Sequence, residues 1–347
     1  MEIYRCVNCM GEIAKEEKVC HHCGYDTAGH VQPVNALRAE TILNGRYLVG
    51  RVLGQGGFGI TYVGYDLTLG IKVAIKEYFP GGFAGRDGQL SSSLQWSFTN
   101  SERQNWNDSL DNFLSEARKM AKLDEIPGIV RVRDCFKENQ TAYIVMDYAE
   151  GVTLREYLKQ KGRMDYTSCV RLLLPIMESL ETVHEKGLVH RDISPDNLMV
   201  RKKDKELKVS LLDFGAAIDM GMEHSGKSQS IVKKGYSAPE QYMENGNVGG
   251  WSDVYSMAAV IYRCVTGTEI PEAMERVMKG ALVAMGGVSN KAARQVLTDA
   301  LALKTEERTG TMAEFRKALM ETLPVGGNNK KKAAVTGAAA AALLAVC

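Results

Sequence analysis

The stretch HRDISPDN, residues 190–197, is the part of the sequence around which the rest is organised. It places Asp192 five residues before Asn197. A long core helix is predicted directly before it, over residues 166–186, because apolar side chains recur there at helical spacing. Gly187 is the residue at which this helix is expected to end. The polar stretch therefore begins immediately after a buried helix.

The composition is that of a globular chain without a strong charge bias. Of 347 residues, 45% are hydrophobic and 24% are charged, which suits about two domains. Forty-three basic residues against 42 acidic ones leave a net charge of +1, so bulk charge does not favour a nucleic-acid partner. The opening MEIYRCVNCMGE does not resemble a secretion signal, and we expect a cytoplasmic body. In that reducing compartment, paired cysteines are better interpreted as metal ligands than as disulfides.

Four cysteines near the N-terminus have the spacing of a metal site. Cys6 and Cys9 form one C-x-x-C pair, and Cys20 and Cys23 form a second. Four thiolates complete a tetrahedral shell around Zn²⁺, which leaves no open position and indicates a structural ion. A module of this size is too small to build an apolar core. Metal binding would therefore supply its folding free energy, which is about 10–16 kcal/mol for structural zinc sites. Residues 1–28 resemble a zinc ribbon; a redox dithiol is the alternative.

A strand–glycine–strand pattern opens the next domain, after a predicted linker over residues 29–43. Residues 47–53 are predicted to form a strand, GQGGFG covers residues 54–59, and a second strand follows directly. In a dinucleotide-binding fold the glycines would open a helix, so this order indicates a glycine hairpin between two strands. Backbone N–H groups in such a hairpin can approach phosphates without interference from Cβ atoms.

Further elements follow along the chain. The sequence VAIK ends a third predicted strand at Lys76. Residues 78–107 are rich in Gly, Ser and Asn and are predicted to form a mobile insertion. Residues 111–123 show a helical apolar stripe, and Glu116 projects from this helix. Two more strands are predicted, over residues 129–136 and residues 141–148.

Together these motifs resemble one protein family. GQGGFG, VAIK and HRDISPDN are followed by DFG at residues 213–215 and GYSAPE at residues 235–240. In this order they resemble a Hanks-type bacterial serine/threonine protein kinase over residues 44–323. The resemblance implies an α+β class and a bilobal kinase fold over residues 44–325. Its β-rich N-lobe would cover residues 44–149, and its helical C-lobe would cover residues 150–325.

The resemblance also implies roles for single residues. Asp192 would accept the proton of the substrate hydroxyl, while Asn197 and Asp213 would bind Mg²⁺. Lys76, paired with Glu116, would hold the nucleotide phosphates. The other expected ATP-binding residues are Gly54, Gln55, Gly56, Gly57, Phe58, Gly59, Thr61, Ala74, Met146, Asp147, Ala149 and Met199.

The resemblance also implies two structural contacts, and the sequence differs from the family at two positions near the catalytic loop. By resemblance, Asp253 would brace the backbone of HRDISPDN, and Glu240 would pair with Arg308. Ser194 stands where these kinases carry a lysine that neutralises the γ-phosphate, and Lys233 stands where they carry a threonine. A hydroxyl carries no charge, so transition-state stabilisation is expected to fall unless Lys233 or its neighbour substitutes.

The C-terminal residues form a separate segment. A basic linker over residues 326–332 precedes AAVTGAAAAALLAVC, residues 333–347. This apolar run is shorter than the ~20 residues that span a bilayer. Two interpretations stay open: a truncated transmembrane helix that anchors the kinase at the cytoplasmic face of the membrane, and a soluble alanine-rich tail.

The sequence favours an ATP-dependent protein kinase that phosphorylates Ser or Thr in protein substrates and in itself. The expected cofactors are ATP, Mg²⁺ and Zn²⁺, with the ribbon as a module for binding a protein partner. The alternative is a nucleotide-binding pseudokinase scaffold with weak or no transfer. Nucleic-acid binding by the ribbon has little support, because its acidic residues counter its lysines and leave no basic stripe.

Overall fold

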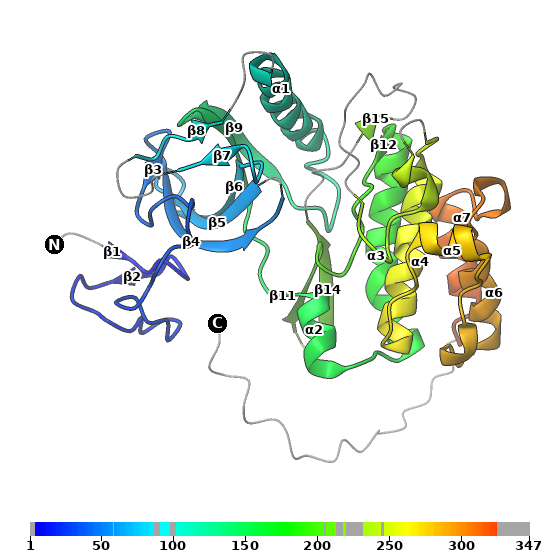
Figure 1. Cartoon of the computed structure of the whole chain (residues 1–347). Helices are drawn as coiled ribbons and strands as arrows, with labels where there is room; N and C mark the ends of the chain where they lie inside the picture. Colours follow the sequence, from blue (N-terminus) through cyan, green and yellow to red (C-terminus); the bar gives the residue numbers. More distant parts are fainter. Residues whose placement is uncertain are drawn as a thin grey trace. The chain divides into compact units, whose positions relative to one another are not determined.

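The computed structural model describes residues 4–57, 59–86, 91–97, 102–204, 206–212, 218–219, 232–243 and 246–324. Within these residues the chain forms two compact units. The first comprises the described residues from 4 to 121 and residues 131–148, and the second comprises residues 122–130 and the described residues from 149 to 324. The first is rich in strands and the second in helices, which confirms the predicted α+β, two-lobed class (Figure 1).

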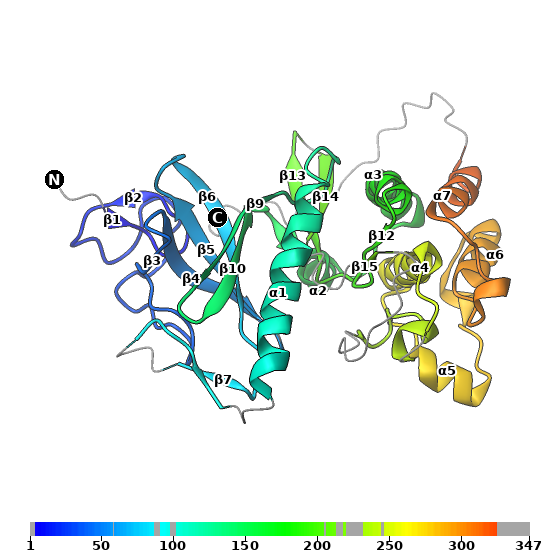
Figure 2. The same cartoon turned by 90° about the horizontal axis from the view of Figure 1, so that it is seen from above.

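The first unit is built on an antiparallel sheet of six strands in the order β3-β4-β5-β6-β10-β9 (Figures 1 and 2). Among the described residues of this unit, the one helix is α1, which packs against β9 and β10. In chain order the elements are β1 (Tyr4–Arg5), β2 (Glu12–Ile13), β3 (Ile42–Leu43), β4 (Tyr47–Gln55), β5 (Gly59–Asp66), β6 (Ile71–Tyr78), β7 (Ala84–Gly85), β8 (Gln95–Trp96), α1 (Glu102–Ala121), β9 (Val132–Glu138) and β10 (Thr141–Asp147).

The register of this sheet separates a core face from a second face. Thr61 lies opposite Lys76, and Ala74 lies opposite Met146. Because opposed residues share a face and alternate residues along a strand do too, these four side chains lie on one side. The other side is the buried core, which includes Ile60, Tyr62, Val73, Ile75, Tyr143 and Val145.

A charged pair is buried in this core. The side chains of Glu77 and Arg86 are both 0% exposed and form an ion pair. The hydroxyls of Tyr62 and Tyr143 donate to the two Glu77 carboxylate oxygens, at 2.7 and 2.8 Å. Arg86 Nη1 also donates to the carbonyl of Asn35 at 2.8 Å. These bonds satisfy both charges, as burial requires.

The predicted mobile insertion over residues 78–107 needs correction. Its described part is anchored through Arg86, and β7 pairs with β8 in a short hairpin. Leu94 is buried, and its N–H donates to the carbonyl of Asn139 at 3.0 Å. The helix predicted from residue 111 begins earlier, at Glu102, because the polar first turns of α1 carry no apolar periodicity that could reveal them.

The cysteine-rich module and the predicted linker belong to the first unit and contact its sheet. The N–H of Arg51 in β4 donates to the carbonyl of Val7 at 2.8 Å. A Cβ at Gly50 would overlap the Met10 side chain and lie 2.5 Å from the Val7 carbonyl oxygen, so only glycine allows this approach. The linker residue Leu37 is fully buried, and its N–H donates to the Tyr62 hydroxyl at 3.0 Å.

The second unit is mainly helical. Helices α3 and α4 lie side by side, and α7 packs against both of them (Figures 1 and 2). In chain order the elements are β11 (Val152–Thr153), α2 (Leu154–Lys161), α3 (Tyr166–Glu185), β12 (Leu188–Val189), β13 (Leu198–Lys203), β14 (Glu206–Leu211), β15 (Ile218–Asp219), η1 (Pro239–Tyr242), α4 (Gly250–Thr266), α5 (Ala273–Lys279), η2 (Met285–Gly287), α6 (Lys291–Ala300), η3 (Thr305–Glu307) and α7 (Met312–Glu321).

Helix α3 matches its prediction closely and sets the position of the polar stretch. Asp165 caps its N-terminus by accepting from the Ser168 N–H, and Gly187 follows its last turn with a φ of +77°. The apolar face of α3 is buried, including Leu173, Ile176 and Leu180. β12 starts directly after this turn, and residues 190–197 connect it to β13.

Among the described residues, no helix combines the length and the apolar character that a membrane crossing requires. The apolar segment 333–347, on which the predicted anchor depended, lies outside the described residues.

Candidate functional site

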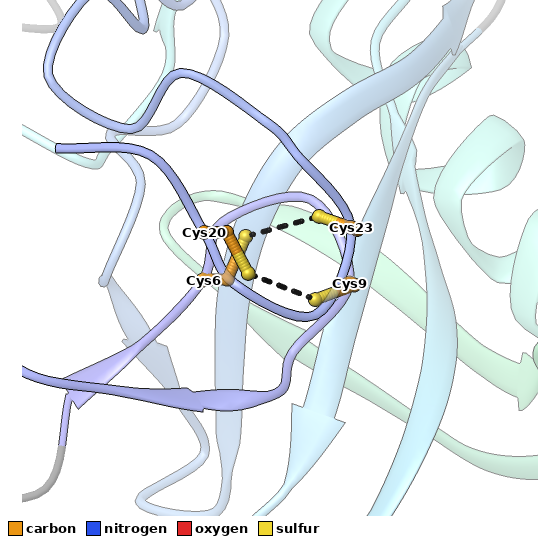
Figure 3. Close-up of side chains that lie close together, drawn as sticks. All are labelled: Cys6, Cys9, Cys20 and Cys23. Atoms are coloured by element: carbon orange, nitrogen blue, oxygen red, sulfur yellow. Dashed lines mark hydrogen bonds between the residues drawn. The ribbon is translucent and has the colours of Figure 1, made fainter. Parts of the chain in front are cut away.

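The four N-terminal cysteines converge into one cluster (Figure 3). Their sulfur atoms all lie within 4.8 Å of one another, with Cys6 to Cys23 and Cys9 to Cys20 at 3.7 Å. Zn–S bonds of about 2.3 Å at tetrahedral angles separate sulfurs by about 3.8 Å, whereas a disulfide requires about 2.05 Å. The spacing therefore fits a tetrahedral metal and excludes a disulfide in this arrangement.

The two knuckles of the cluster have the same backbone geometry. The Met10 N–H donates to the Cys6 carbonyl at 2.9 Å, and the Gly24 N–H donates to the Cys20 carbonyl at 2.7 Å. Met10 and Gly24 both have positive φ, +64° and +70°. Gly11 has a different reason to be glycine, since a Cβ there would lie 2.6 Å from the ring of His22.

A polar link runs from the cluster to the sheet. Asn8 Nδ2 donates to Cys23 Sγ at 3.4 Å, and Asn8 Oδ1 accepts from Arg51 Nε at 2.5 Å. Arg51 lies on β4, the strand that leads into the glycine-rich turn. One asparagine thus links a sulfur of the cluster to the strand. Groups that support metal ligands from outside the ligand shell commonly make such bonds.

The glycine-rich stretch is a hairpin between β4 and β5, as predicted. The Gly56 N–H donates to the Gly59 carbonyl at 2.9 Å. Cβ atoms at Gly54, Gly56 and Gly57 would meet no atom of the described residues within 4 Å, so those residues leave space beside the backbone for a ligand. Glycine leaves the backbone amides there accessible to phosphate oxygens. Phe58 lies outside the described residues.

Lys76 lies on the sheet face opposite the core. It is half-buried on β6 between Thr61 of β5 and Ile144 of β10. Helix α1 packs against β9 and β10, and the Phe113 ring contacts the Tyr78 ring at 5.3 Å. Tyr78 shares its face with Lys76, and Glu116 is one helical turn from Phe113. The fold thus brings Glu116 to the sheet face that carries Lys76.

Four further residues predicted to contact ATP lie in or next to strands β10 and β13. Met146 is buried on β10, and the Asp147 N–H donates to the Arg131 carbonyl at 2.9 Å. This bond occupies the Asp147 donor, and Asp147 also pairs with Val73 of β6. In the second unit, Met199 lies half-buried on β13, opposite Thr153. Ala149 follows β10 as the first residue of the second unit's main segment.

The backbone of the stretch 190–197 is held by one buried carboxylate. Asp253 of α4 accepts from the N–H groups of His190 and Arg191, each at 2.9 Å, and from His184 Nε2 at 2.8 Å. Burial disfavours its charge, but these donors outweigh burial and hold the pKa of Asp253 below its ordinary value. The expectation that Asp253 braces this loop matches these contacts.

The side chains of Asp192 and Asn197 meet at the end of this loop. Asn197 Nδ2 donates to both the carbonyl and Oδ2 of Asp192, each at 2.8 Å. Since the amide nitrogen makes both bonds, its oxygen is directed away from them, and oxygen is the ligand that Mg²⁺ prefers. The Leu212 N–H donates to the Asn197 carbonyl at 2.8 Å, next to Asp213, which lies outside the described residues.

His190 adds a second constraint on the aspartate. The Asp192 N–H donates to His190 Nδ1 at 3.2 Å, so His190 Nε2 carries the proton and donates to the Leu212 carbonyl at 3.1 Å. Leu212, the residue before Asp213, is therefore hydrogen-bonded to His190 before Asp192 and to Asn197 after it. A carboxylate held in this way is positioned to receive a proton from a hydroxyl group.

Another predicted pair is formed as expected. Glu240 and Arg308 are buried and joined by two bonds, at 2.7 and 3.1 Å, and Ser252 Oγ donates to Glu240 Oε1 at 2.6 Å. Their role is structural.

A cluster of four charged side chains beside the loop was not predicted as a group. Arg155 binds both carboxylate oxygens of Asp196, at 2.5 and 3.1 Å, and also Glu269 at 2.9 Å. Lys233 Nζ lies 2.6 Å from Asp196 Oδ2. Burial opposes the charge of Asp196, but Arg155 and Lys233 outweigh burial and lower its pKa. The paired residues are 37 to 114 positions apart, so spacing in the sequence carries no signal for this cluster.

Comparison with known proteins agrees with this geometry. Residues 97–320 match the family described as the protein kinase domain. PrkC of Bacillus subtilis is 29% identical over 226 residues, which cover 65% of this chain and 31% of PrkC. PknL of Mycobacterium tuberculosis is 31% identical over 235 residues, which cover 66% of this chain and 51% of PknL. Both are serine/threonine-protein kinases.

A solved structure has the same fold. The structure titled PpkA-294 apo form superposes with a TM-score of 0.68 at 30% sequence identity, over 82% of this chain and 99% of that one. The chain spans only about a third to a half of the curated relatives it matches. The family match, the β-rich and helical units and the braced Asp192–Asn197 loop agree: this chain belongs to the protein kinase domain family, with bacterial serine/threonine kinases among its relatives.

Proposed function

We propose that this protein is an ATP- and Mg²⁺-dependent protein kinase that phosphorylates serine or threonine in protein substrates and in itself. The observation that carries the proposal is the loop at Asp192. Its backbone is braced by Asp253, and its carboxylate is oriented by Asn197. This arrangement fixes a carboxylate in a position to receive a proton from a substrate hydroxyl.

In the proposed reaction, Asp192 orients the substrate hydroxyl and accepts its proton as the oxygen attacks the γ-phosphorus. The bond between that phosphorus and the oxygen of ADP breaks, and its electron pair leaves with ADP. Lys76 and the amides of residues 54–57 hold the phosphates. Asn197 and Asp213 would hold Mg²⁺, which would supply positive charge to the phosphate oxygens.

The test is transfer of labelled phosphate from ATP to the protein itself and to dephosphorylated casein. We expect Asp192→Ala to lower the rate by about 10²–10⁴-fold, the usual contribution of a positioned base. Asp204→Ala is a suitable control, because Asp204 lies on the exposed turn between β13 and β14. Equal incorporation by wild type and Asp192→Ala would instead support the pseudokinase scaffold, which the uncharged Ser194 favours.

We also propose that the four-cysteine cluster binds structural Zn²⁺ and that its outer surface contacts a protein partner. The tetrahedral sulfur spacing supports the metal. Metal analysis of the purified protein should find about one zinc per chain, and Cys6→Ser together with Cys23→Ser should abolish it. Protein without bound metal that keeps the same ribbon amide signals in nuclear magnetic resonance would refute the site.

A further inference from the structure

Ser194 cannot provide the charge that phosphoryl transfer requires. Its side chain is fully buried, and Ser194 Oγ makes no hydrogen bond to any residue that the structure describes. Within residues 190–198 the only permanently cationic side chain is Arg191, which is itself buried. Charge builds on the transferring phosphoryl group and its leaving oxygen, so a cation is needed there.

Lys233 is held against the same loop from another segment. Its N–H donates to Ser237 Oγ at 2.8 Å, and its carbonyl accepts from the N–H groups of Tyr236 and Ser237. This tight turn fixes the backbone from which the lysine projects. Gln241 Nε2, further along the segment, donates to the carbonyl of Arg191 at 2.7 Å, one residue before the catalytic aspartate.

The ammonium group of Lys233 lies at Asp196, in the turn that follows Asp192. Lys233 Nζ lies 2.6 Å from Asp196, whose neighbour Asn197 bonds to the Asp192 carboxylate. The Asn197 N–H donates to the Ser194 carbonyl at 3.0 Å, which closes the turn between these residues. The ammonium is therefore anchored two residues beyond the position that lacks a lysine.

Lys233 also keeps capacity for a further partner. Asp196 is already bound through both oxygens by Arg155, whereas the ammonium of Lys233 has three donors and makes this single ion pair among the described residues. Its side chain is 33% exposed, so an incoming anion can reach it. A lysine ammonium on a flexible four-carbon stem has three rotatable donors, so it can bridge a carboxylate and a phosphate.

We propose that Lys233 supplies the cation that stabilises the γ-phosphoryl group during transfer, in place of the lysine missing at Ser194. This rests on the proposed kinase function. As the substrate oxygen bonds to the γ-phosphorus and the bond to ADP breaks, the ammonium donates a hydrogen bond to a phosphoryl oxygen. The substrate proton still passes to Asp192, and Lys233 stays protonated throughout.

The test compares phosphate transfer to casein by variants of neighbouring lysines. Lys233→Met keeps the length of the side chain without its charge, and we expect kcat to fall by about 10²–10³-fold, as when one charge-stabilising donor is lost. Lys233→Arg should retain activity within about tenfold. Lys234→Met is the matched control, since Lys234 is 86% exposed and lies 4.0 Å from Glu272; its activity should change less than about twofold.

Moving the lysine from position 233 to position 194 distinguishes a catalytic role of Lys233 from a role in anchoring the loop. We expect Ser194→Lys combined with Lys233→Thr to be at least about tenfold more active than Lys233→Thr alone, because charge returns from the loop itself. A merely structural lysine at 233 could not be rescued in this way. Melting temperatures and ATP affinities, measured for every variant, identify any that misfold.

Two results would overturn the proposal. One is unchanged kcat in a folded Lys233→Met variant; the other is loss of activity in a folded Lys233→Arg variant equal to that in Lys233→Met. Both would leave the kinase function intact. A wild-type protein that transfers no more phosphate than Asp192→Ala would refute the kinase function, and the catalytic role of Lys233 with it.

Discussion

The buried pair of Glu77 and Arg86 predicts a large and specific loss of stability in the first unit. Arg86→Met keeps the aliphatic stem but removes the guanidinium. Glu77 would then be a fully buried carboxylate that, among the described residues, keeps two tyrosine hydroxyls as side-chain donors. The carbonyls of Asn35 and Ser92 would each lose a donor as well.

The magnitude follows from the charge left behind. Removing one partner of a buried ion pair costs about 3–5 kcal/mol, so we expect the free energy of unfolding to fall by that amount in Arg86→Met. In Glu77→Gln combined with Arg86→Met, no net charge remains. The cost should then approach the about 1–3 kcal/mol of unsatisfied polar groups. The double variant is therefore predicted to be more stable than the single one.

Urea unfolding followed by circular dichroism measures these differences, and hydrogen exchange of the β6 peptide locates them in the first unit. Lys137→Met is the control, because Lys137 and Asp111 are 50% and 68% exposed and their ion pair is worth about 0–1 kcal/mol. A loss of less than about 1 kcal/mol in Arg86→Met would refute the reasoning. A double variant less stable than Arg86→Met would refute it too.

Three further predictions concern the ribbon and the catalytic loop. Gly50→Ala should destabilise the first unit by about 1–3 kcal/mol, because the new methyl overlaps Met10; urea unfolding should show this loss, and wild-type stability would contradict it. Asn8→Ala should lower Zn²⁺ affinity by about 10–100-fold in competition with a chromogenic chelator, and an unchanged affinity would show that Asn8 does not support the ligand. The lowered pKa of Asp253 contributes stability above the unfolded value of about 3.9, and this contribution is lost as pH falls through the folded pKa. Wild type should therefore lose more stability than Asp253→Asn below about pH 4 in acid titrations of unfolding, and parallel curves would exclude this linkage.

Short, chemically specific patterns in the sequence predicted most of the candidate site. Two C-x-x-C pairs can be satisfied by one tetrahedral ion, so Cys6 and Cys23 were correctly placed together although 17 residues separate them. Helix α3 was predicted to within one residue because its buried face has a clear period. In both cases the local pattern and the tertiary environment impose the same requirement.

Other features depend on contacts that no local pattern reveals. Glu77 follows Lys76 directly, but the sequence around Glu77 does not distinguish it from an exposed acidic residue. Its burial depends on the ion pair with Arg86. The segment that carries Arg86 has a polar, glycine-rich composition, which is typical of loops whether or not they are anchored. Likewise, Met10 adopts a positive φ that composition would assign to Gly11. A positive φ is uncommon for a residue with a side chain, so the sequence gives no sign of it at Met10.

The position of the missing lysine shows the same limit in functional terms. Phosphoryl transfer requires positive charge at a point in space, and any segment that reaches this point can supply it. Serine in place of lysine at position 194 therefore predicts weak kinase activity only if cations from other segments of the chain are ignored. The turn at residues 233–237 brings Lys233 to Asp196, which lies 37 residues earlier in the chain. The position that lacks a lysine and the lysine proposed to replace it are therefore distant in the sequence but lie at the same loop in the fold. Whether a kinase-like chain is active is accordingly better judged from the charges around its catalytic loop than from the loop's own letters.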